Sequence, residues 1–418
     1  MRRSLRPTNL LPLLPLLHLT GCGGGDPSAA WAGSVDTLPS GMVVVTNPSE
    51  GVWDESTAWR VTPVVRIGAL EGEGPDLFGS ITAIEVDLAG RIWVLDGQAQ
   101  ELRVFDADGR FVRTIGRKGG GPGEFNQVMG MAWDAVGRLW VVDPRNNRIS
   151  ILDTAGTFLT SHRTQGGFIS MPWPGGFDDA GYFYNIAPYQ SGTAFRMALV
   201  KYDTTGTALD TIHPPRWQGP ENFFEHVSND GNSRMRTGVP YTPGLLQRFT
   251  RSGDFWFAHT GPYELYLRTA AGDTLLMATK PFDPLPVSSA DRDSAIAGLE
   301  WFTGQGGRVD RSRIPNLKPA IRGLHVGEDG TVWVVPTRPT GDDTPGTLFD
   351  VFAPNGRYLG QVHTPFPVWG VPIIRGGRFV TVSRDELEVQ YVVVARIENY
   401  TTPELRDRPR GVPLGGSR

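Results

Sequence analysis

The sequence has a single cysteine and no long apolar run after its first 21 residues. Cys22 stands alone among 418 residues, which excludes an intramolecular disulfide. No later stretch approaches the roughly 18 consecutive apolar residues that indicate a membrane-spanning helix. The formal net charge is −4 at pH 7, and such a weakly acidic chain offers little attraction to nucleic acid. A disulfide scaffold is therefore excluded, and we expect no nucleic-acid partner.

Motifs that indicate catalysis or a bound metal are also missing. The histidines show no His-Glu-x-x-His spacing, and no Gly-x-Ser-x-Gly segment offers a serine nucleophile. The glycine-rich residues 117–123 lack the Gly-Lys-Ser/Thr of a nucleotide-binding loop, so we interpret them as a turn. We expect His325 to be buried and hydrogen-bonded. The sequence predicts no cofactor.

The N-terminal residues have the order of a bacterial signal peptide. Arginines in the first six residues precede an apolar run over residues 10–19, too short to span a bilayer. The run ends in Leu19-Thr20-Gly21-Cys22, which resembles the lipobox of bacterial lipoproteins. That resemblance implies removal of residues 1–21 and a lipid on Cys22. Several acyl chains on one residue would anchor the protein stably to a membrane.

The segment that follows Cys22 is rich in glycine, proline, serine and alanine. This composition predicts a flexible tether over residues 22–58. No aspartate follows Cys22 directly, so the usual signal for inner-membrane retention is absent. We therefore expect a lipid-anchored protein of the cell envelope, on the outer membrane and facing the periplasm or the cell surface.

An internal repeat dominates the body of the chain. Residues 84–96, IEVDLAGRIWVLD, match residues 131–143, MAWDAVGRLWVVD, at an offset of 47 residues. A period in the forties built from short alternating strands is typical of a β-propeller. Asp-x-x-Gly occurs twice in each unit, and the aspartate and glycine predict tight turns between strands.

The fold class that follows is all-β, a six-bladed β-propeller with four-stranded blades over residues 59–398. The sixth blade lacks an outer strand, and the N-terminal strand around residues 64–68 is predicted to complete it and close the ring. Residues 399–418 are expected to form a disordered tail. The blades are predicted at residues 79–116, 117–165, 166–213, 246–282, 319–364 and 365–398.

The first two repeats resemble a known family. Residues 115–125, with the Trp-Asp pair at 133–134 and the strand at 139–143, resemble the NHL repeat and the bacterial six-bladed propeller lipoproteins. The match is strong over blades one and two and fair in blade five. The resemblance implies the propeller fold.

Two long insertions, residues 214–245 and 283–318, are predicted on the face opposite the Asp-x-x-Gly turns. Residues 288–302 of the second predict one short amphipathic helix. The insertions are expected to wall or roof the channel mouth, or alternatively to fill space between blades. Binding candidates on this face come from loops, strand starts and the first insertion: Arg322, Trp369, Arg145, Asn146, Glu124 and Phe224.

The leading functional interpretation is a non-enzymatic module that binds or scaffolds a protein or small ligand on the insertion-bearing face. A metal-dependent hydrolase, lactonase or lyase in the central channel is the alternative, with carboxylates such as Glu73 or Glu85 holding the metal. The motif around Glu73 resembles that of propeller lactonases, although the internal repeat also explains it as a turn. A third possibility is a subunit of an envelope assembly complex.

Overall fold

The computed structural model describes residues 31–164, 173, 175–191, 194–213, 215, 223–228, 231 and 233–402. The side chains of residues 188–197 are outside this description. The predicted signal peptide, Cys22 and residues 403–418 also lie outside the described residues.

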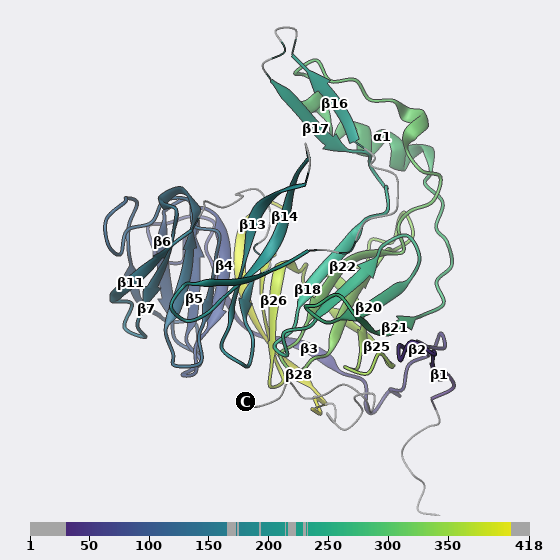
Figure 1. Cartoon of the computed structure of the whole chain (residues 1–418), viewed down its shortest axis with the longest axis horizontal. Helices are drawn as coiled ribbons and strands as arrows, with labels where there is room; N and C mark the ends of the chain where they lie inside the picture. The colour runs from purple at the N-terminus through teal and green to yellow at the C-terminus, as the bar shows by residue number, and fades with distance from the viewer. Residues whose placement is uncertain are drawn as a thin grey trace, which may run out of the picture.

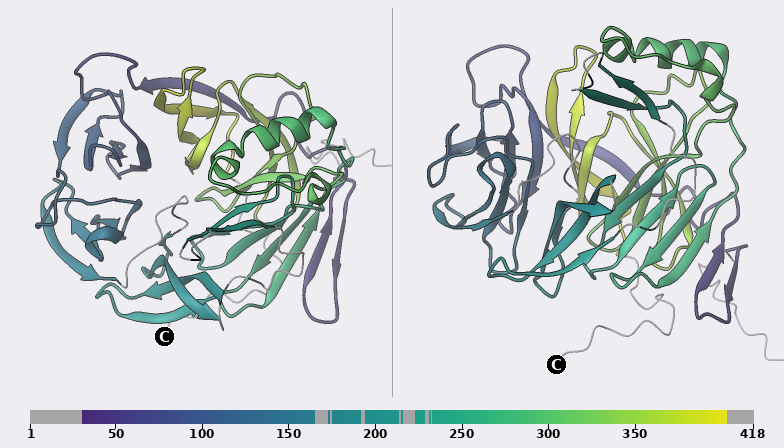
Figure 2. Two further views of the ribbon diagram at one scale, coloured as in Figure 1. Left: turned by 90° about the horizontal axis from the view of Figure 1, so that it is seen from above. Right: turned by 45° about the horizontal axis from the view of Figure 1, so that its top comes forward.

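Six antiparallel four-stranded blades surround a central axis, which confirms the predicted fold (Figure 1). Viewed from above, the blades form a ring (Figure 2, left). Blade one consists of β4 (Ile81–Val86), β5 (Ile92–Asp96), β6 (Glu101–Phe105) and β7 (Phe111–Ile115). Blade two consists of β8 (Gly130–Trp133), β9 (Leu139–Asp143), β10 (Arg148–Leu152) and β11 (Phe158–Arg163). Blade three consists of β12 (Gly176–Phe177), β13 (Phe183–Ser191), β14 (Ala194–Tyr202) and β15 (Ala208–Ile212). Blade four consists of β18 (Leu245–Phe249), β19 (Phe255–His259), β20 (Glu264–Arg268) and β21 (Thr274–Thr279). Blade five consists of β22 (Ile321–Val326), β23 (Val332–Pro336), β24 (Thr347–Phe352) and β25 (Tyr358–Thr364). Blade six consists of β26 (Trp369–Arg375), β27 (Arg378–Arg384), β28 (Gln390–Glu398) and β3 (Arg60–Ile67).

The ring is closed by the N-terminal strand, as the sequence predicts. Strand β3 pairs antiparallel with β28 and becomes the outer strand of blade six. Its Val61 and Ile67 are buried against the neighbouring sheets. Because the last blade borrows its outer strand from the other end of the chain, the fold leaves no blade incomplete.

Large aromatic side chains fill the space between blades. Second-strand residues Trp93, Trp140, Trp256 and Trp333 are each at most 2% exposed, and they stand at equivalent positions in four blades. Ion pairs bracket the links between second and third strands, since Arg103 lies 3.4 Å from Asp96 and Arg148 lies 3.7 Å from Asp143. Both aspartates are fully buried. These contacts hold the loops between second and third strands against the core.

Part of the segment predicted as a flexible tether is ordered. Strands β1 (Ser34–Thr37) and β2 (Val43–Thr46) form a hairpin, and β2 extends blade four by pairing parallel with β21. Val45 is 1% exposed in the core beside blades four and five. The three consecutive valines of β2 supply the strand signal that the segment's glycine and proline content obscured. The predicted tail also begins later, because the Tyr400 hydroxyl donates to Asp329 at 3.0 Å.

The two insertions pack together into one unit above the blades (Figures 1 and 2). The first contributes the hairpin β16 (Phe223–Val227) and β17 (Arg234–Gly238). The second contributes α1 (Ser289–Ala297), α2 (Glu300–Thr303) and the 3₁₀ turn η2 (Arg311–Arg313), so the single helix predicted over residues 288–302 is broken at Gly298. Their shared core contains Phe224, Leu299 and Phe302. We call this the insertion unit.

A buried aspartate attaches the insertion unit to blade five. Asp291 closes a capping box with Ser288 at the start of α1. It also accepts from Lys318 at 2.9 Å and from Thr340 at 3.0 Å, and Thr340 lies between β23 and β24. Hydrogen bonds from Lys318 and Ser288 hold the pKa of Asp291 far below its usual value against the effect of burial. The unit therefore has a fixed position over the ring.

Candidate channel site

The two faces of the ring differ in their connections. One carries the links between strands one and two and between strands three and four, and we call it the turn face. The opposite face carries the insertion unit, and we call it the insertion face. A cavity of about 840 Å³ lies on the central axis at the turn face, and the inner strands of all six blades contribute to it. This cavity is thus on the face opposite the predicted one.

Aromatic and aliphatic side chains make up much of the cavity wall. Trp133, Phe177 and Phe249 each stand at the end of an inner strand, and Ile373 and Ile374 come from β26. The Asp-x-x-Gly turns that follow the inner strands form the rim, for example through Ala89 and Ala135. A cavity of this size that combines apolar walls with polar groups is typical of a small-molecule site.

Strand register puts ionisable side chains at one level of the inner wall. In five blades, the inner-strand residue that pairs with the large aromatic residue of the second strand occupies an equivalent position. The five are Glu85 opposite Trp93, Ala132 opposite Trp140, Gly176 opposite Tyr184, Arg248 opposite Trp256, and His325 opposite Trp333. Three blades therefore carry a carboxyl, a guanidinium and an imidazole where two others carry alanine and glycine.

Glu85 lines the cavity and is only partly exposed. Burial raises the pKa of this carboxyl to about 8, and the nearby Arg375 guanidinium opposes that effect. At neutral pH the side chain is therefore mostly protonated. A neutral carboxyl group can donate one hydrogen bond and accept others, which a carboxylate cannot do.

Arg375 joins the end of blade six to blades one and five. Its Nη1 donates to the Val86 carbonyl at 3.2 Å, and its Nη2 forms an ion pair with Glu328. Burial alone would lower the pKa of Arg375, but the hydrogen bond and charge of Glu328 raise it. This cation remains charged beside Glu85 at any physiological pH.

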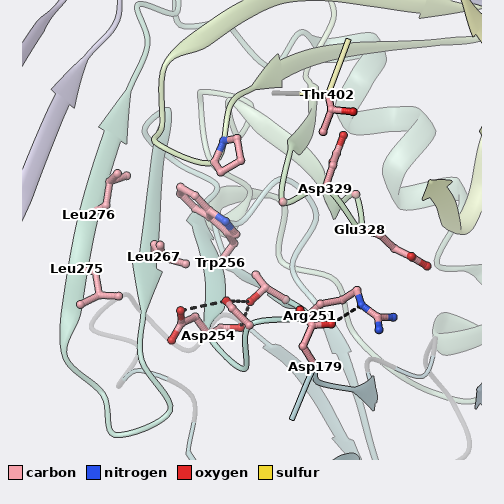
Figure 3. A pocket seen from close by; sticks show the side chains of 15 residues that line it. Asp179, Arg251, Asp254, Trp256, Leu267, Leu275, Leu276, Glu328, Asp329 and Thr402 are labelled. Carbon is pink, nitrogen blue, oxygen red and sulfur yellow. Dashed lines mark hydrogen bonds and ion pairs between the residues drawn. The ribbon is translucent and has the colours of Figure 1, made fainter. Parts of the chain in front are cut away.

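A smaller cavity of about 210 Å³ adjoins the first, between the turns of blades four and five (Figure 3). The two share Asp179, Thr250, Arg251, Gly327 and Glu328 in their walls. Arg251 lies 2.8 Å from Asp179, and the pair stands at the boundary between the cavities. The far end of the smaller cavity is apolar, with Trp256, Leu267 and Leu276. A ligand longer than the channel is wide would find an apolar extension here.

The predicted binding residues of blade two lie together on the insertion face. Asn146, within η1 (Pro144–Asn146), donates to the Gly119 carbonyl at 2.9 Å, and Glu124 forms an ion pair with Arg117 at 2.8 Å. Arg145 is exposed beside them. The polar atoms of Asn146 and Glu124 are thus engaged in holding the glycine-rich loop.

The other predicted binding residues are dispersed. Phe224 is 2% exposed and packs inside the insertion unit. Trp369 is 51% exposed, with the Arg384 guanidinium 3.7 Å above its ring, and Arg322 is exposed at the start of blade five. None of the six lines either cavity described here. Their binding role stays a prediction.

No group of three or more histidine, cysteine, aspartate or glutamate side chains within the described ranges is arranged to hold a metal ion. Glu73 is exposed in the loop before blade one. No helix in the described part of the chain is long and apolar enough to cross a membrane.

Residues 65–245 match a family model described as a 6-bladed beta-propeller. Among solved structures, the chain is similar to a Bacteroides fragilis protein provisionally described as exported, with 13% identity over 85% of this chain and 99% of that one and a TM-score of 0.46. It is also similar to virginiamycin B lyase from Staphylococcus aureus, with 10% identity, 81% and 99% coverage and a TM-score of 0.42. A Bacteroides thetaiotaomicron protein of unknown function shares 12% identity over 82% and 76%, with a TM-score of 0.46. No curated protein matches the chain.

Proposed function

We propose that this six-bladed propeller binds a small amphipathic molecule in the channel cavity of the turn face, while a lipid on Cys22 holds it at the cell envelope. The observation that carries the proposal is the meeting of an apolar wall with the Glu85 carboxyl and the Arg375 guanidinium in one cavity. Apolar surface supplies affinity, and a few fixed polar groups supply orientation.

The polar groups are held before any ligand arrives. Arg375 is fixed by the Val86 carbonyl and by Glu328, and Arg251 is fixed by Asp179. Arg375 ends inner strand β26 and Arg251 lies in the turn that follows inner strand β18, and both strands belong to a closed ring of sheets. A ligand would therefore lose its own freedom on binding but would not have to order the site, which favours affinity.

The start of the described chain bears on how the cavity would face a membrane. Trp31 donates to Asn47 at 3.2 Å, and Asn47 donates to the carbonyl of Gly356, which belongs to a turn of the turn face. Figure 1 shows β1 and β2 on the side of the ring away from the insertion unit. Eight residues lie between Cys22 and Trp31, so the two are at most about 30 Å apart along a fully extended chain. An anchor on Cys22 would therefore keep the cavity mouth turned toward the membrane.

General acid–base catalysis in the same cavity is the second candidate. Glu85, with its pKa raised to about 8, could deliver or accept a proton near neutral pH. A hydrolase or lyase reaction would require a bound substrate with its reacting atom beside this carboxyl. If the wild type converts its captured ligand, and Glu85→Gln still binds that ligand but no longer converts it, the protein is an enzyme and not only a binding protein.

The test uses two rim positions on the same turn. Ala135 lines the cavity, whereas neighbouring Val136 is 75% exposed and does not. Full-length protein is extracted from its own membranes in mild detergent, and released small molecules are identified by mass spectrometry. We expect one enriched compound with the wild type and with Val136→Trp, and its loss with Ala135→Trp. Equal recovery from both variants, or no compound from the wild type, would contradict the proposal.

A further inference from the structure

Two large apolar side chains stand almost fully in solvent on the turn face, beside the mouth of the channel cavity. Leu88 is 94% exposed and Val136 is 75% exposed, more than any other large apolar side chain among the described residues. They belong to the first Asp-x-x-Gly turns of blades one and two, whose inner strands pack side by side. Ala89 and Ala135 stand next to them in the chain and are also exposed. We call these four residues the apolar rim.

The corresponding turns of the next three blades are polar. Blade three presents Asp179, blade four presents Arg251 and Ser252, and blade five presents Glu328 and Asp329. An ion pair of 2.8 Å joins Asp179 to Arg251 across two of these turns. The mouth of the cavity is thus charged on one side and apolar on the other. Water solvates the charged side well, whereas the apolar rim is a surface that water solvates poorly.

Hydrogen bonds hold the turns of the apolar rim in one conformation. Asp87 accepts from the backbone N–H of Ala89 at 3.0 Å, and Asp134 accepts from that of Val136 at 3.1 Å. The side chains of Leu88 and Val136 are therefore presented to solvent by a fixed backbone. A partner that covers them would not have to order these turns first, which favours binding.

An exposed leucine on the insertion face has different surroundings. Leu387, which is 69% exposed, lies in the turn between β27 and β28, where Asp385 accepts from its backbone N–H at 3.0 Å. Its neighbours Glu386 and Glu388 are exposed. Since transfer of a carboxylate out of water is costly, this turn is suited to solvent. Leu387 thus shares the turn chemistry of the apolar rim but not its apolar surroundings.

The start of the described chain indicates what covers the apolar rim. Strands β1 and β2 extend blade four, and they lie on the side of the ring away from blades one and two (Figure 2, left). Eight residues lie between Cys22 and Trp31, so a lipid on Cys22 would enter a bilayer within about 30 Å of Trp31. The anchor and the apolar rim would then hold the turn face to the membrane at two points on opposite sides of the cavity mouth.

We propose that the apolar rim docks on the phospholipid bilayer that holds the lipid of Cys22, so that the channel cavity opens toward the acyl chains. The inference rests on the proposed anchoring and binding function and adds the surface that contacts the membrane. Two aliphatic side chains bind a bilayer weakly by themselves, but the anchor makes their contact intramolecular and so raises its population. Leu88, Ala89 and Ala135 also line the cavity, so an apolar ligand can pass along them from the bilayer.

Quenching by labelled lipid measures this contact directly. Full-length lipidated protein is reconstituted into phosphatidylcholine vesicles that carry a nitroxide on their acyl chains. An environment-sensitive fluorophore is attached to Leu88→Cys, to Val136→Cys or to the control Leu387→Cys, and the wild type treated in the same way reports any reaction of Cys22. We expect at least about two-fold stronger quenching at positions 88 and 136 than at position 387. Equal quenching at the three positions would overturn the proposal.

A second comparison keeps the label outside the apolar rim. The fluorophore is placed on Ala155→Cys, an exposed position in the turn between the third and fourth strands of blade two. Leu88→Glu combined with Val136→Glu should weaken quenching there at least about two-fold, because charged side chains do not enter the acyl region. Leu387→Glu should leave it unchanged. Unchanged quenching in the double variant would show that the anchor alone holds this face at the bilayer, and would overturn the role of the rim.

The outcomes also separate this inference from the proposed function. Flotation of the wild type with vesicles reports the anchor, and a protein that stays in the aqueous layer would overturn both anchoring and docking. If quenching fails while a compound is still captured by the wild type and lost in Ala135→Trp, docking is rejected and the cavity remains the binding site. If quenching is as expected but the wild type captures no compound, the rim docks on the bilayer and the small-molecule function is rejected.

Discussion

The indole nitrogen of Trp93 donates to the carboxylate of Asp87 at 3.0 Å, so one aspartate holds both a turn and a core side chain. The same carboxylate accepts from the backbone N–H groups of Ala89 and Arg91. Blade two repeats the arrangement with Trp140 and Asp134 at 3.1 Å. The Asp-x-x-Gly turns that form the cavity rim are thereby fixed to the packing between blades.

This double role predicts a large effect of Asp87→Ala on stability. The change removes two turn hydrogen bonds and leaves the buried Trp93 indole and the Arg91 guanidinium without their partner, which should cost about 2–4 kcal/mol of unfolding free energy. Asp106→Ala is the matched control, because Asp106 accepts the same turn bonds but no indole. It should cost about 1 kcal/mol. Urea unfolding measures both, and equal losses would refute the double role.

Glu85 predicts a loss of stability in alkaline solution. Its pKa is about 8 in the folded protein against an ordinary value of 4.5, so the folded state binds the proton more tightly than the unfolded state does. The stabilising contribution is complete below pH 4.5 and is lost as the pH rises through 8. The melting temperature of the wild type, relative to Glu85→Gln, should fall between pH 5 and pH 9.

Glu124→Gln serves as the control for that pH profile. Hydrogen bonds from Gly121 and Arg117 lower the pKa of Glu124, which is the direction opposite to the shift at Glu85. Its difference from the wild type should therefore stay constant between pH 5 and pH 9. A parallel pair of profiles for wild type and Glu85→Gln would mean that Glu85 is already ionised at pH 5.

His325 predicts the opposite dependence of stability on pH, namely a loss of stability in acid solution. Its pKa is about 3 in the folded protein against 6.5 ordinarily, so its contribution to stability is present above pH 6.5 and is lost as the pH falls toward 3. The wild type should lose more stability than His325→Asn between pH 6.5 and pH 4. His363→Asn, at an exposed position, is the control. Chemical denaturation at each pH supplies the comparison, and identical acid profiles would disprove the prediction.

The insertion unit predicts a local response to the loss of its core. Phe302 is fully buried and Trp301 is 50% exposed, although they are neighbours on α2. Phe302→Ala should destabilise the unit by about 3–5 kcal/mol, whereas Trp301→Ala should cost under about 1 kcal/mol. Hydrogen exchange should accelerate over the described parts of residues 223–238 and over 287–314 and not in the blades. Acceleration throughout the ring would contradict an independent unit.

The architecture could be predicted from the sequence because each of its signals is local. The matched segments around Trp93 and Trp140, the turn glycines and the strand around Val65 all act over a few residues or repeat at a fixed interval. The pairing of Asp96 with Arg103 could be predicted for the same reason. Strand β2 was missed because its partner, β21, lies more than 200 residues away.

The cavity could not be predicted, because it depends on which residues of six distant strands share one level. Glu85 lies two residues before Asp87, the first residue of its Asp-x-x-Gly turn. In the same way, Arg248 lies two residues before the turn that begins at Thr250, and His325 lies two residues before the turn that begins at Gly327. Aligning the turns would therefore have brought these three residues together. The choice of face was drawn instead from the long insertions, whose apolar residues such as Phe224 pack against one another.

The most direct test of the channel site compares solvent access at two introduced thiols. Ala135→Cys puts one on the cavity rim, and Arg145→Cys puts one on the insertion face, in full-length protein whose own Cys22 is expected to carry lipid. Alkylation rates are measured with and without a small-molecule extract of the native membranes. Protection of Cys at position 135 and not at position 145 is the predicted result. Protection at position 145 alone would place the ligand on the insertion face and contradict the channel site.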